Sequence, residues 1–259
     1  MTLSHPHPPF HRCENPLLLL HGFLATPHAV SGLAARLSRA GYCTYLVDLG
    51  GLFGRFNALP IEDVARAVAA RVERLLRDHR LQHIDVVGHS KGGLIGRYYI
   101  QKLGGATRVR HLVTLGTPHR GTPWAYSGYA LRRILPSLSQ MAPGSRLLGE
   151  LSDDTFPRTV RLTSIYSERD ALCPPASCRL EVGLGGHLKN VAVSDGGHLE
   201  FLFRKRFAAI VESALESVQP SIGRAAARGG AQRPTSRRRG PATRDLVAAG
   251  QRELAAVPA

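Results

Sequence analysis

The sequence is 259 residues long and 43% hydrophobic, enough to form one domain with a core of ordinary size. Its net charge of +15 comes from 34 basic against 19 acidic residues without a clean basic stripe, which disfavours nucleic acid as the main partner. The apolar run Leu17–Leu20 is far too short to cross a membrane, and residues 1–14 lack the pattern of a signal peptide. We therefore expect a cytoplasmic protein.

Apolar and amphipathic segments alternate along residues 15–219. Their patterns predict strands at 16–21, 42–48, 83–88, 109–115, 159–166 and 188–193, and helices at 27–40, 61–80, 91–103 and 201–217. Strands that alternate with helices imply a mostly parallel sheet with helices on both faces. We predict one α/β domain over residues 15–219, preceded by a flexible segment, residues 1–14.

The first predicted strand ends at the pair His21-Gly22. Gly22 allows the backbone to turn so that the N–H of Phe23 can point into a cleft. Such an N–H is one half of an oxyanion hole, in which each donor lowers the reaction barrier by about 3 kcal/mol. Phe23 is therefore a candidate donor if a nucleophile lies nearby.

Gly88-His89-Ser90-Lys91-Gly92 lies between a predicted strand and a predicted helix. Gly-x-Ser-x-Gly in this position predicts a nucleophile elbow, a sharp turn that lifts the serine hydroxyl clear of the sheet. A Cβ at either glycine would collide with neighbouring backbone, and the serine must adopt a strained conformation. Ser90 is the predicted nucleophile, and the N–H of Lys91 is the expected second oxyanion donor.

Five segments together resemble the bacterial triacylglycerol lipase and esterase families, over about residues 15–215. They are His21–Leu24, Gly88–Gly93, Leu115–Thr122, Gln140–Ser145 and Tyr166–Asp170. The resemblance implies an α/β-hydrolase fold, and a catalytic acid and then a histidine that follow the serine in the chain. Lys91 departs from the pattern, because these lipases more often carry Met or Gln there.

The segment from about 117 to 156 is too long for a plain loop in a compact domain, and it is rich in apolar residues such as Trp124 and Leu148. We predict a short helical cap there. In the resembling lipases this region lies over the serine and shapes the acyl pocket. The alternative is a packing unit that does not contact the substrate.

Asp170 follows the predicted strand at 159–166, where a carboxylate can orient an imidazole, and is favoured as the acid on position and resemblance. Glu168 shares the same turn and is its closest rival. Asp153 and Asp154 precede the strand, and Asp195 lies too close in sequence to the expected histidine.

Two similar segments contain the candidate bases, His187 and His198. His198 follows the last predicted strand, and catalytic groups gather at the carboxyl ends of parallel strands. His198 is therefore the predicted base, and His187 is predicted to be a turn residue before that strand.

Residues 220–259 are rich in Arg, Ala, Gly and Pro, and we predict that they form a disordered tail. The tail holds eight arginines against Asp245 and Glu253, so Arg237–Arg239 would allow peripheral contact with an anionic membrane.

The four cysteines lack the spacing of a metal site. Cys173 and Cys178 flank two prolines just beyond Asp170, where a bridge would stiffen the acid loop. The sequence leaves that bridge open.

These residues predict a serine hydrolase that cleaves carboxylic esters of small molecules or lipids through an acyl-enzyme. Ser90 attacks, His198 takes its proton, Asp170 holds the imidazolium, and the N–H groups of Phe23 and Lys91 bind the oxyanion. No cofactor and no metal are expected. The alternatives are acyl transfer from the same acyl-serine to an alcohol or amine, and a non-catalytic binding protein with this fold. Acyl chain length and oligomeric state are left open.

Overall fold

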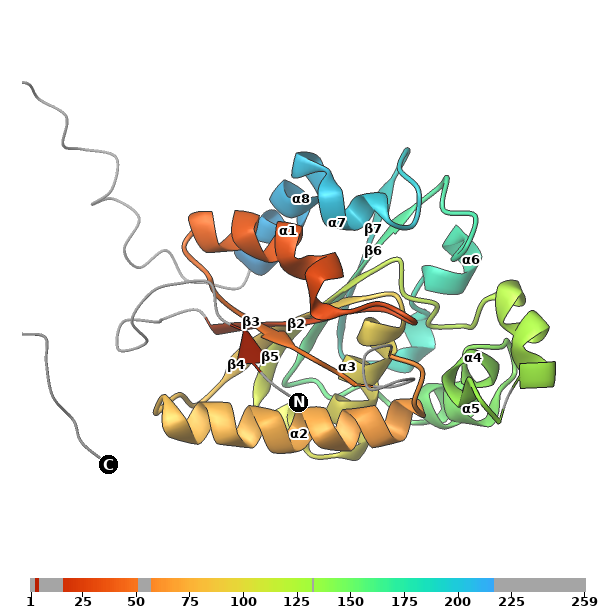
Figure 1. The fold of residues 1–259 in the computed structure, drawn as a ribbon, viewed down its shortest axis with the longest axis horizontal. Helices are drawn as coiled ribbons and strands as arrows, with labels where there is room; N and C mark the ends of the chain where they lie inside the picture. The colour runs from red at the N-terminus through yellow and green to blue at the C-terminus, as the bar shows by residue number, and fades with distance from the viewer. Residues whose placement is uncertain (1–2, 5–15, 51–56, 132, 217–259) are drawn as a thin grey trace, which may run out of the picture. The chain divides into compact units, whose positions relative to one another are not determined.

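The computed structural model describes residues 3–4, 16–50, 57–131 and 133–216. A seven-stranded sheet in the order β1-β3-β2-β4-β5-β6-β7 forms the centre of this part of the chain (Figure 1). The strands are β1 (Leu3–Ser4), β2 (Pro16–Leu20), β3 (Cys43–Val47), β4 (Ile84–His89), β5 (Val109–Leu115), β6 (Arg161–Ser167) and β7 (His187–Val193). Strands β2 to β7 are parallel, and β1 pairs antiparallel with β3. The predicted, mostly parallel sheet is confirmed.

Helices cover both faces of the sheet. The α-helices are α1 (Pro27–Arg39), α2 (Ile61–Asp78), α3 (Lys91–Lys102), α4 (Pro136–Gln140), α5 (Arg146–Asp153), α6 (Pro175–Cys178), α7 (Glu200–Phe203) and α8 (Lys205–Glu216). Short 3-10 helices are η2 (Gly105–Thr107), η3 (Pro123–Leu131) and η4 (Val182–Leu184). None of the described helices combines the length and the apolar character that a membrane span needs.

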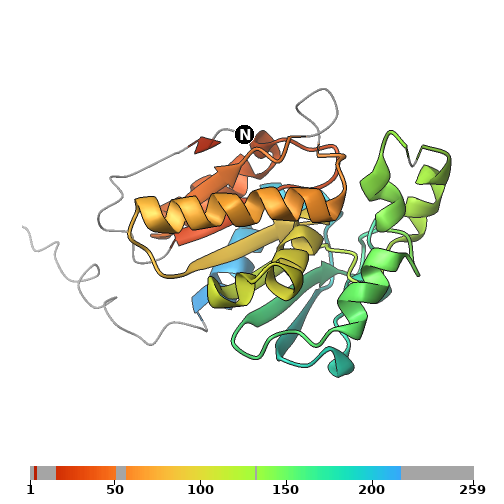
Figure 2. The same ribbon diagram turned by 90° about the horizontal axis from the view of Figure 1, so that it is seen from below.

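The core lies in two layers, one on each side of the sheet, and each layer is covered by the helices on that side (Figures 1 and 2). Side chains alternate along β2, so that Leu18 and Leu20 pack with α2 and α3, whereas Leu17 and Leu19 pack with α1 and α8. Both sets are buried. A strand with covered faces on both sides is therefore a continuous apolar run, as in the sequence of β2.

The predicted helix at 201–217 is confirmed as helical over most of its length but is not continuous, because the chain forms α7 and α8 with a break at Arg204. The backbone of Arg204 is extended, with φ −80° and ψ 132°. In one continuous helix, Leu202 and Val211 would point about 180° apart. The break allows both side chains to be buried in the same core layer. The last predicted residue of that helix lies outside the described residues.

Two terminal segments, residues 1–14 and 220–259, are predicted to be flexible or disordered. Strand β1 falls within the segment predicted to be flexible, residues 1–14, and no pattern in the sequence predicts this strand. The rest of that segment and the predicted disordered tail, residues 220–259, lie outside the described residues.

The predicted cap consists of η3, α4 and α5. In both views these helices lie beyond the carboxyl ends of the parallel strands (Figures 1 and 2). Ser145 caps α5 by accepting a hydrogen bond from the N–H of Leu148 (3.4 Å), which fixes where this helix begins. The cap thus occupies the end of the sheet at which the candidate site residues gather.

Candidate active site

Ser90 occupies the single position between β4 and α3. Its φ of 54° and ψ of −124° are strained for a residue with a side chain. The turn is fixed because the Ser90 N–H donates to the carbonyl of Leu115 (2.9 Å) and the Ser90 carbonyl accepts from the N–H of Gly93 (3.0 Å). A Cβ at Gly88 would lie 2.5 Å from Gly93 N, and one at Gly92 would press against the Leu20 carbonyl. This is the tight turn that the motif predicts.

Asp170 and His198 come from the loops that follow β6 and β7. His198 Nδ1 lies 2.7 Å from Asp170 Oδ2. The other carboxylate oxygen of Asp170 accepts from the N–H groups of Leu172 (3.0 Å) and Cys173 (2.8 Å). Because three donors hold this buried carboxylate, it can fix the orientation of the imidazole.

His89 and Gly116 connect the pair of Asp170 and His198 to the turn at Ser90. His89 Nε2 donates to the carbonyl of His198 (2.9 Å), and the two imidazole centroids are 4.7 Å apart. A Cβ at Gly116 would lie 3.0 Å from Asp170 Oδ2 and 3.2 Å from His198 Nδ1. The described residues include no hydrogen bond between Ser90 Oγ and His198, as is common before substrate binds.

Burial and hydrogen bonding have opposite effects on the histidines of the site. Burial lowers the pKa of His198, but the hydrogen bond to Asp170 and the neighbouring Cys173 thiol outweigh it and raise the pKa to about 9. Burial lowers the pKa of His89 to about 3 and that of His21 to about 4. His198 is therefore the ring in this group that can readily gain a proton.

The candidate oxyanion donors lie beside the serine. A Cβ at Gly22 would come within 3.1 Å of Ser90 Cβ, so the loop after β2 lies directly against Ser90. Within the described ranges, no hydrogen bond satisfies the backbone N–H of Phe23 or of Lys91. Lys91 is also the first residue of α3, where the helix dipole favours negative charge. Two unpaired N–H donors beside a nucleophile are what an oxyanion requires.

The side chain of Lys91 contributes a feature that the sequence analysis missed. It is completely buried, and its Nζ donates to Asn57 Oδ1 (2.7 Å), the Asn57 carbonyl (3.2 Å) and the Leu59 carbonyl (2.7 Å). Burial lowers its pKa to about 7, while the charge of Glu62 raises it. The sequence signal that could have indicated a buried ammonium is the position of this lysine, between a buried strand and the buried face of a helix.

The rival acids do not pair with His198. Glu168 is exposed, and Asp195 pairs with Arg206. Asp154 pairs with Lys102 (2.5 Å) on the surface. Among the described residues, neither these three nor Asp153 forms a hydrogen bond or an ion pair with His198.

His187 lies at the opposite end of the sheet from His198. The prediction that it is a turn residue is wrong, because it is the first residue of β7 and pairs with Arg161 at the start of β6. Its side chain is exposed. The amino end of a strand is at the opposite edge of the sheet from the loops that carry Asp170 and His198.

Cys173 and Cys178 are free thiols, so the bridge that the sequence left open is not formed. The Cys178 thiol instead donates to the carbonyl of Cys173 (3.3 Å). No group of three or more His, Cys, Asp or Glu within the described part of the chain could hold a metal ion.

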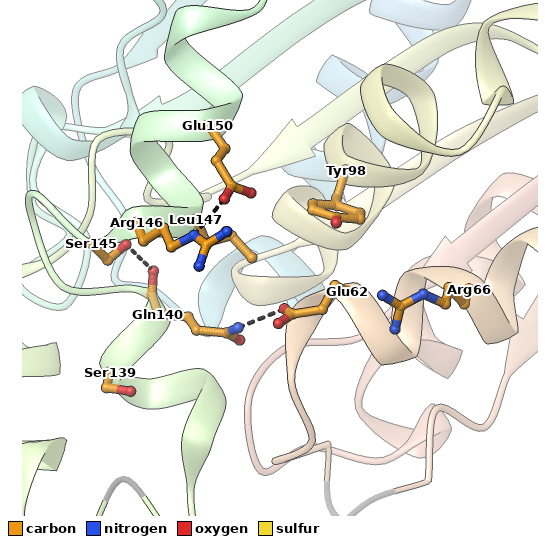
Figure 3. Close-up of a pocket in the computed structure, with 9 residues that line it drawn as sticks. All are labelled: Glu62, Arg66, Tyr98, Ser139, Gln140, Ser145, Arg146, Leu147 and Glu150. Carbon is orange, nitrogen blue, oxygen red and sulfur yellow. Dashed lines mark hydrogen bonds and ion pairs between the residues drawn. The ribbon is translucent and has the colours of Figure 1, made fainter.

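A pocket of about 500 Å³ lies between α2, α3 and the cap helices (Figure 3). Many of its polar side chains pair with one another: Gln140 donates to Glu62 (2.5 Å), and Arg146 donates to Glu150 (2.7 Å). Ser90, Asp170 and His198 do not line this pocket. It belongs to the contact between the cap and α2.

Exposed apolar side chains follow the carboxyl ends of five strands. They are Leu24, Leu59, Trp124, Tyr126, Ile134, Leu172 and Leu199. Trp124 is 60% exposed, although its Nε1 donates to the carbonyl of Ala171 in the acid loop (2.9 Å). Large apolar side chains left exposed together at one end of a domain often mark a binding surface.

The chain is similar in sequence to a known protein family and to a known deacylase. Residues 15–152 match the model of a family described as alpha/beta hydrolase fold. Over 179 residues the chain is 27% identical to a GPI inositol-deacylase of Candida albicans, which covers 62% of this chain. The chain spans only 39% of the length of that relative.

Two solved structures resemble the chain at low sequence identity. The mature lipase BlEst2 of Bacillus licheniformis has a TM-score of 0.64 at 16% identity, covering 83% of this chain and 96% of that chain. A thermophilic esterase from Thermogutta terrifontis has a TM-score of 0.61 at 16% identity, covering 84% of this chain and 93% of that chain. At these identities the likeness shows a shared fold and leaves the substrate open.

Proposed function

The chain belongs to the alpha/beta hydrolase fold family, and on this premise we propose that it is a serine hydrolase that cleaves carboxylic esters through an acyl-enzyme. The observation that carries the proposal is the strained Ser90 beside the hydrogen-bonded pair of Asp170 and His198. Backbone strain of this kind costs about 1–3 kcal/mol, persists only where surrounding contacts hold it, and is concentrated at active sites.

In the proposed reaction, Ser90 Oγ attacks the ester carbonyl carbon while His198 Nε2 takes the hydroxyl proton. Asp170 accepts from His198 Nδ1 and stabilises the imidazolium that forms. The N–H groups of Phe23 and Lys91 bind the oxyanion of the tetrahedral intermediate. His198 then gives the proton to the departing alcohol, which leaves the acyl group on Ser90. A water molecule, deprotonated by His198, attacks the acyl carbon, the bond to Ser90 Oγ breaks to release the acid, and His198 returns the proton to Oγ.

The proposed substrate is an ester with an apolar acyl group. The exposed apolar side chains at the carboxyl ends of the strands, Trp124 and Leu199 among them, support this substrate class. The name of the Candida albicans relative, a deacylase, agrees with cleavage of an acyl group. The matching lipase and esterase structures are consistent with it through the fold.

Labelling of the full chain with a fluorophosphonate tests the nucleophile directly. We expect one label per chain, on Ser90, and none on Ser90→Ala. A series of p-nitrophenyl esters of increasing chain length then measures kcat/KM, which should rise from acetate to longer acyl groups. An unlabelled protein that hydrolyses no ester of the series would contradict the proposal and favour a non-catalytic binding protein.

A further inference from the structure

Asn57 forms hydrogen bonds with residues that precede and follow the proposed donor Phe23 in the sequence. Asn57 Nδ2 donates to the carbonyl of His21 (3.2 Å), and the Asn57 carbonyl accepts from the N–H of Leu24 (3.3 Å). The N–H of Asn57 donates in turn to the carbonyl of Ala25 (3.5 Å). Because Phe23 lies between the bonded residues, the direction of its N–H depends on the position of Asn57.

Lys91, the residue after Ser90, holds Asn57 in place through its side chain. The three oxygens around its Nζ, two from Asn57 and one from Leu59, match the three N–H groups of an ammonium. The side chain is completely buried, and a buried charge is tolerated only where its hydrogen bonds are satisfied. The ammonium therefore holds the segment from Asn57 to Leu59 against the start of α3.

The loop that carries Phe23 needs such support because its backbone is strained. Leu24 has a φ of 50°, a left-handed conformation that a residue with a side chain rarely adopts. Strained residues keep their conformation only where surrounding contacts hold them. In this loop those contacts include the hydrogen bond from Leu24 to Asn57.

The cap also forms hydrogen bonds with the segment that follows Asn57. Ser137 Oγ donates to the carbonyl of Ala58 (3.0 Å), and Gln140 Oε1 accepts from the N–H of Ile61 (2.8 Å). Gln140 also reaches Glu62 at the wall of the pocket in Figure 3. The segment after Asn57 is thus already anchored at its far end, and Lys91 supplies the anchor next to the nucleophile.

We propose that the side chain of Lys91 is a positioning residue for the oxyanion hole, which acts through Asn57 to set the N–H of Phe23. Lys91 then determines both donors, one with its own backbone N–H and the other through its side chain. The inference rests on the proposed function, since it assigns Lys91 a role in binding the oxyanion formed at Ser90.

Lys91→Met tests this role, because it keeps the backbone N–H and removes the ammonium. The matched control is Lys102→Met, the same substitution at the other end of α3, where Lys102 pairs with Asp154 at the surface. We expect kcat for a p-nitrophenyl ester to fall by about 10- to 100-fold in Lys91→Met, with KM changed by less than about threefold. Affinity for an alkyl trifluoromethyl ketone, which forms an oxyanion on the serine, should fall by the same factor as kcat/KM.

Amide hydrogen exchange provides a second measurement that needs no turnover. In Lys91→Met the N–H of Leu24 should exchange faster than in the wild type, while the N–H groups of β4 should keep their protection. Asn57→Ala approaches the same loop from the other side and should accelerate the same N–H. Combined with Lys91→Met, it should lower kcat by less than the product of the two single effects.

The outcomes separate the inference from the proposed function. If the wild type neither hydrolyses esters nor takes the fluorophosphonate, the proposed function fails, and with it the role of Lys91 in binding the oxyanion. If the wild type is active but Lys91→Met keeps its kcat and its Leu24 exchange rate, only the inference is overturned. If Lys91→Met does not fold, Asn57→Ala decides, and unchanged kcat and exchange in that variant overturn the inference.

Discussion

Asp170 Oδ2 and His198 Nδ1 lie 2.7 Å apart although 28 residues separate them in the sequence. The two side chains follow β6 and β7, which are adjacent and parallel. Parallel neighbours place their carboxyl ends at the same edge of a sheet, so the two loops meet there.

Removal of the nucleophile should separate activity from stability. Ser90→Ala and Ser90→Gly should each lower ester hydrolysis by about 10⁴-fold or more, because the remaining groups cannot replace Oγ. Ser90→Gly should nevertheless be more stable than Ser90→Ala by about 1 kcal/mol, since glycine relieves the positive φ. Denaturant unfolding of both variants measures the difference. Equal stabilities would show that the turn stores no strain.

The two histidines should differ sharply in effect. His198→Ala should lower kcat nearly as much as Ser90→Ala does, because the nucleophile and the base act as one unit. His187→Ala serves as the matched control, and it should leave kcat within about twofold because its exposed side chain lies at the other end of the sheet. Steady-state kinetics on one ester suffices. A larger loss in His187→Ala than in His198→Ala would contradict the site.

The pH profile should depend on Asp170. His198 must be neutral to accept a proton, and its pKa is raised to about 9, so its limb of the kcat/KM profile should rise between pH 7 and pH 9 and be lost as the pH falls. Lys91, whose pKa is lowered to about 7, titrates in the same range, so the profile is measured in the Lys91→Met background, where that ammonium is absent. Asp170→Asn removes a cause of the raised pKa. The acid limb should therefore move to lower pH, while the maximal rate falls by about 10⁴-fold. A limb at the same pH in both proteins would show that Asp170 does not act on His198.

Two glycine substitutions should change stability in opposite directions. Gly88→Ala places a Cβ 2.5 Å from the backbone nitrogen of Gly93, so it should lower the free energy of unfolding by about 3 kcal/mol or more. Gly149→Ala lies on the exposed side of α5 with no atom within 4 Å of the added Cβ. It should stabilise the protein by about 0.5–1 kcal/mol. A thermal melt of each variant against the wild type distinguishes them.

The sequence by itself determined the features that depend on local sterics and on periodicity. The two glycines around Ser90 predict the strained turn because the clash of a Cβ with nearby backbone is a local matter, and the turn has the expected φ. The alternation of apolar runs and amphipathic segments predicts the parallel sheet, because each pattern satisfies one kind of secondary structure. The preference for His198 over His187 needed only the order of the last strand and the loop after it.

Only the tertiary structure decided which distant groups meet. Lys91 and Asn57 lie 34 residues apart, and no periodicity connects a lysine after the nucleophile with an asparagine in a loop. The break at Arg204 likewise depends on the core beneath it, since Leu202 and Val211 share one layer only when the helix is interrupted. Contacts of this kind arise from packing between helices, strands and loops that are distant in the sequence. A local sequence pattern does not indicate which distant residue will be its partner.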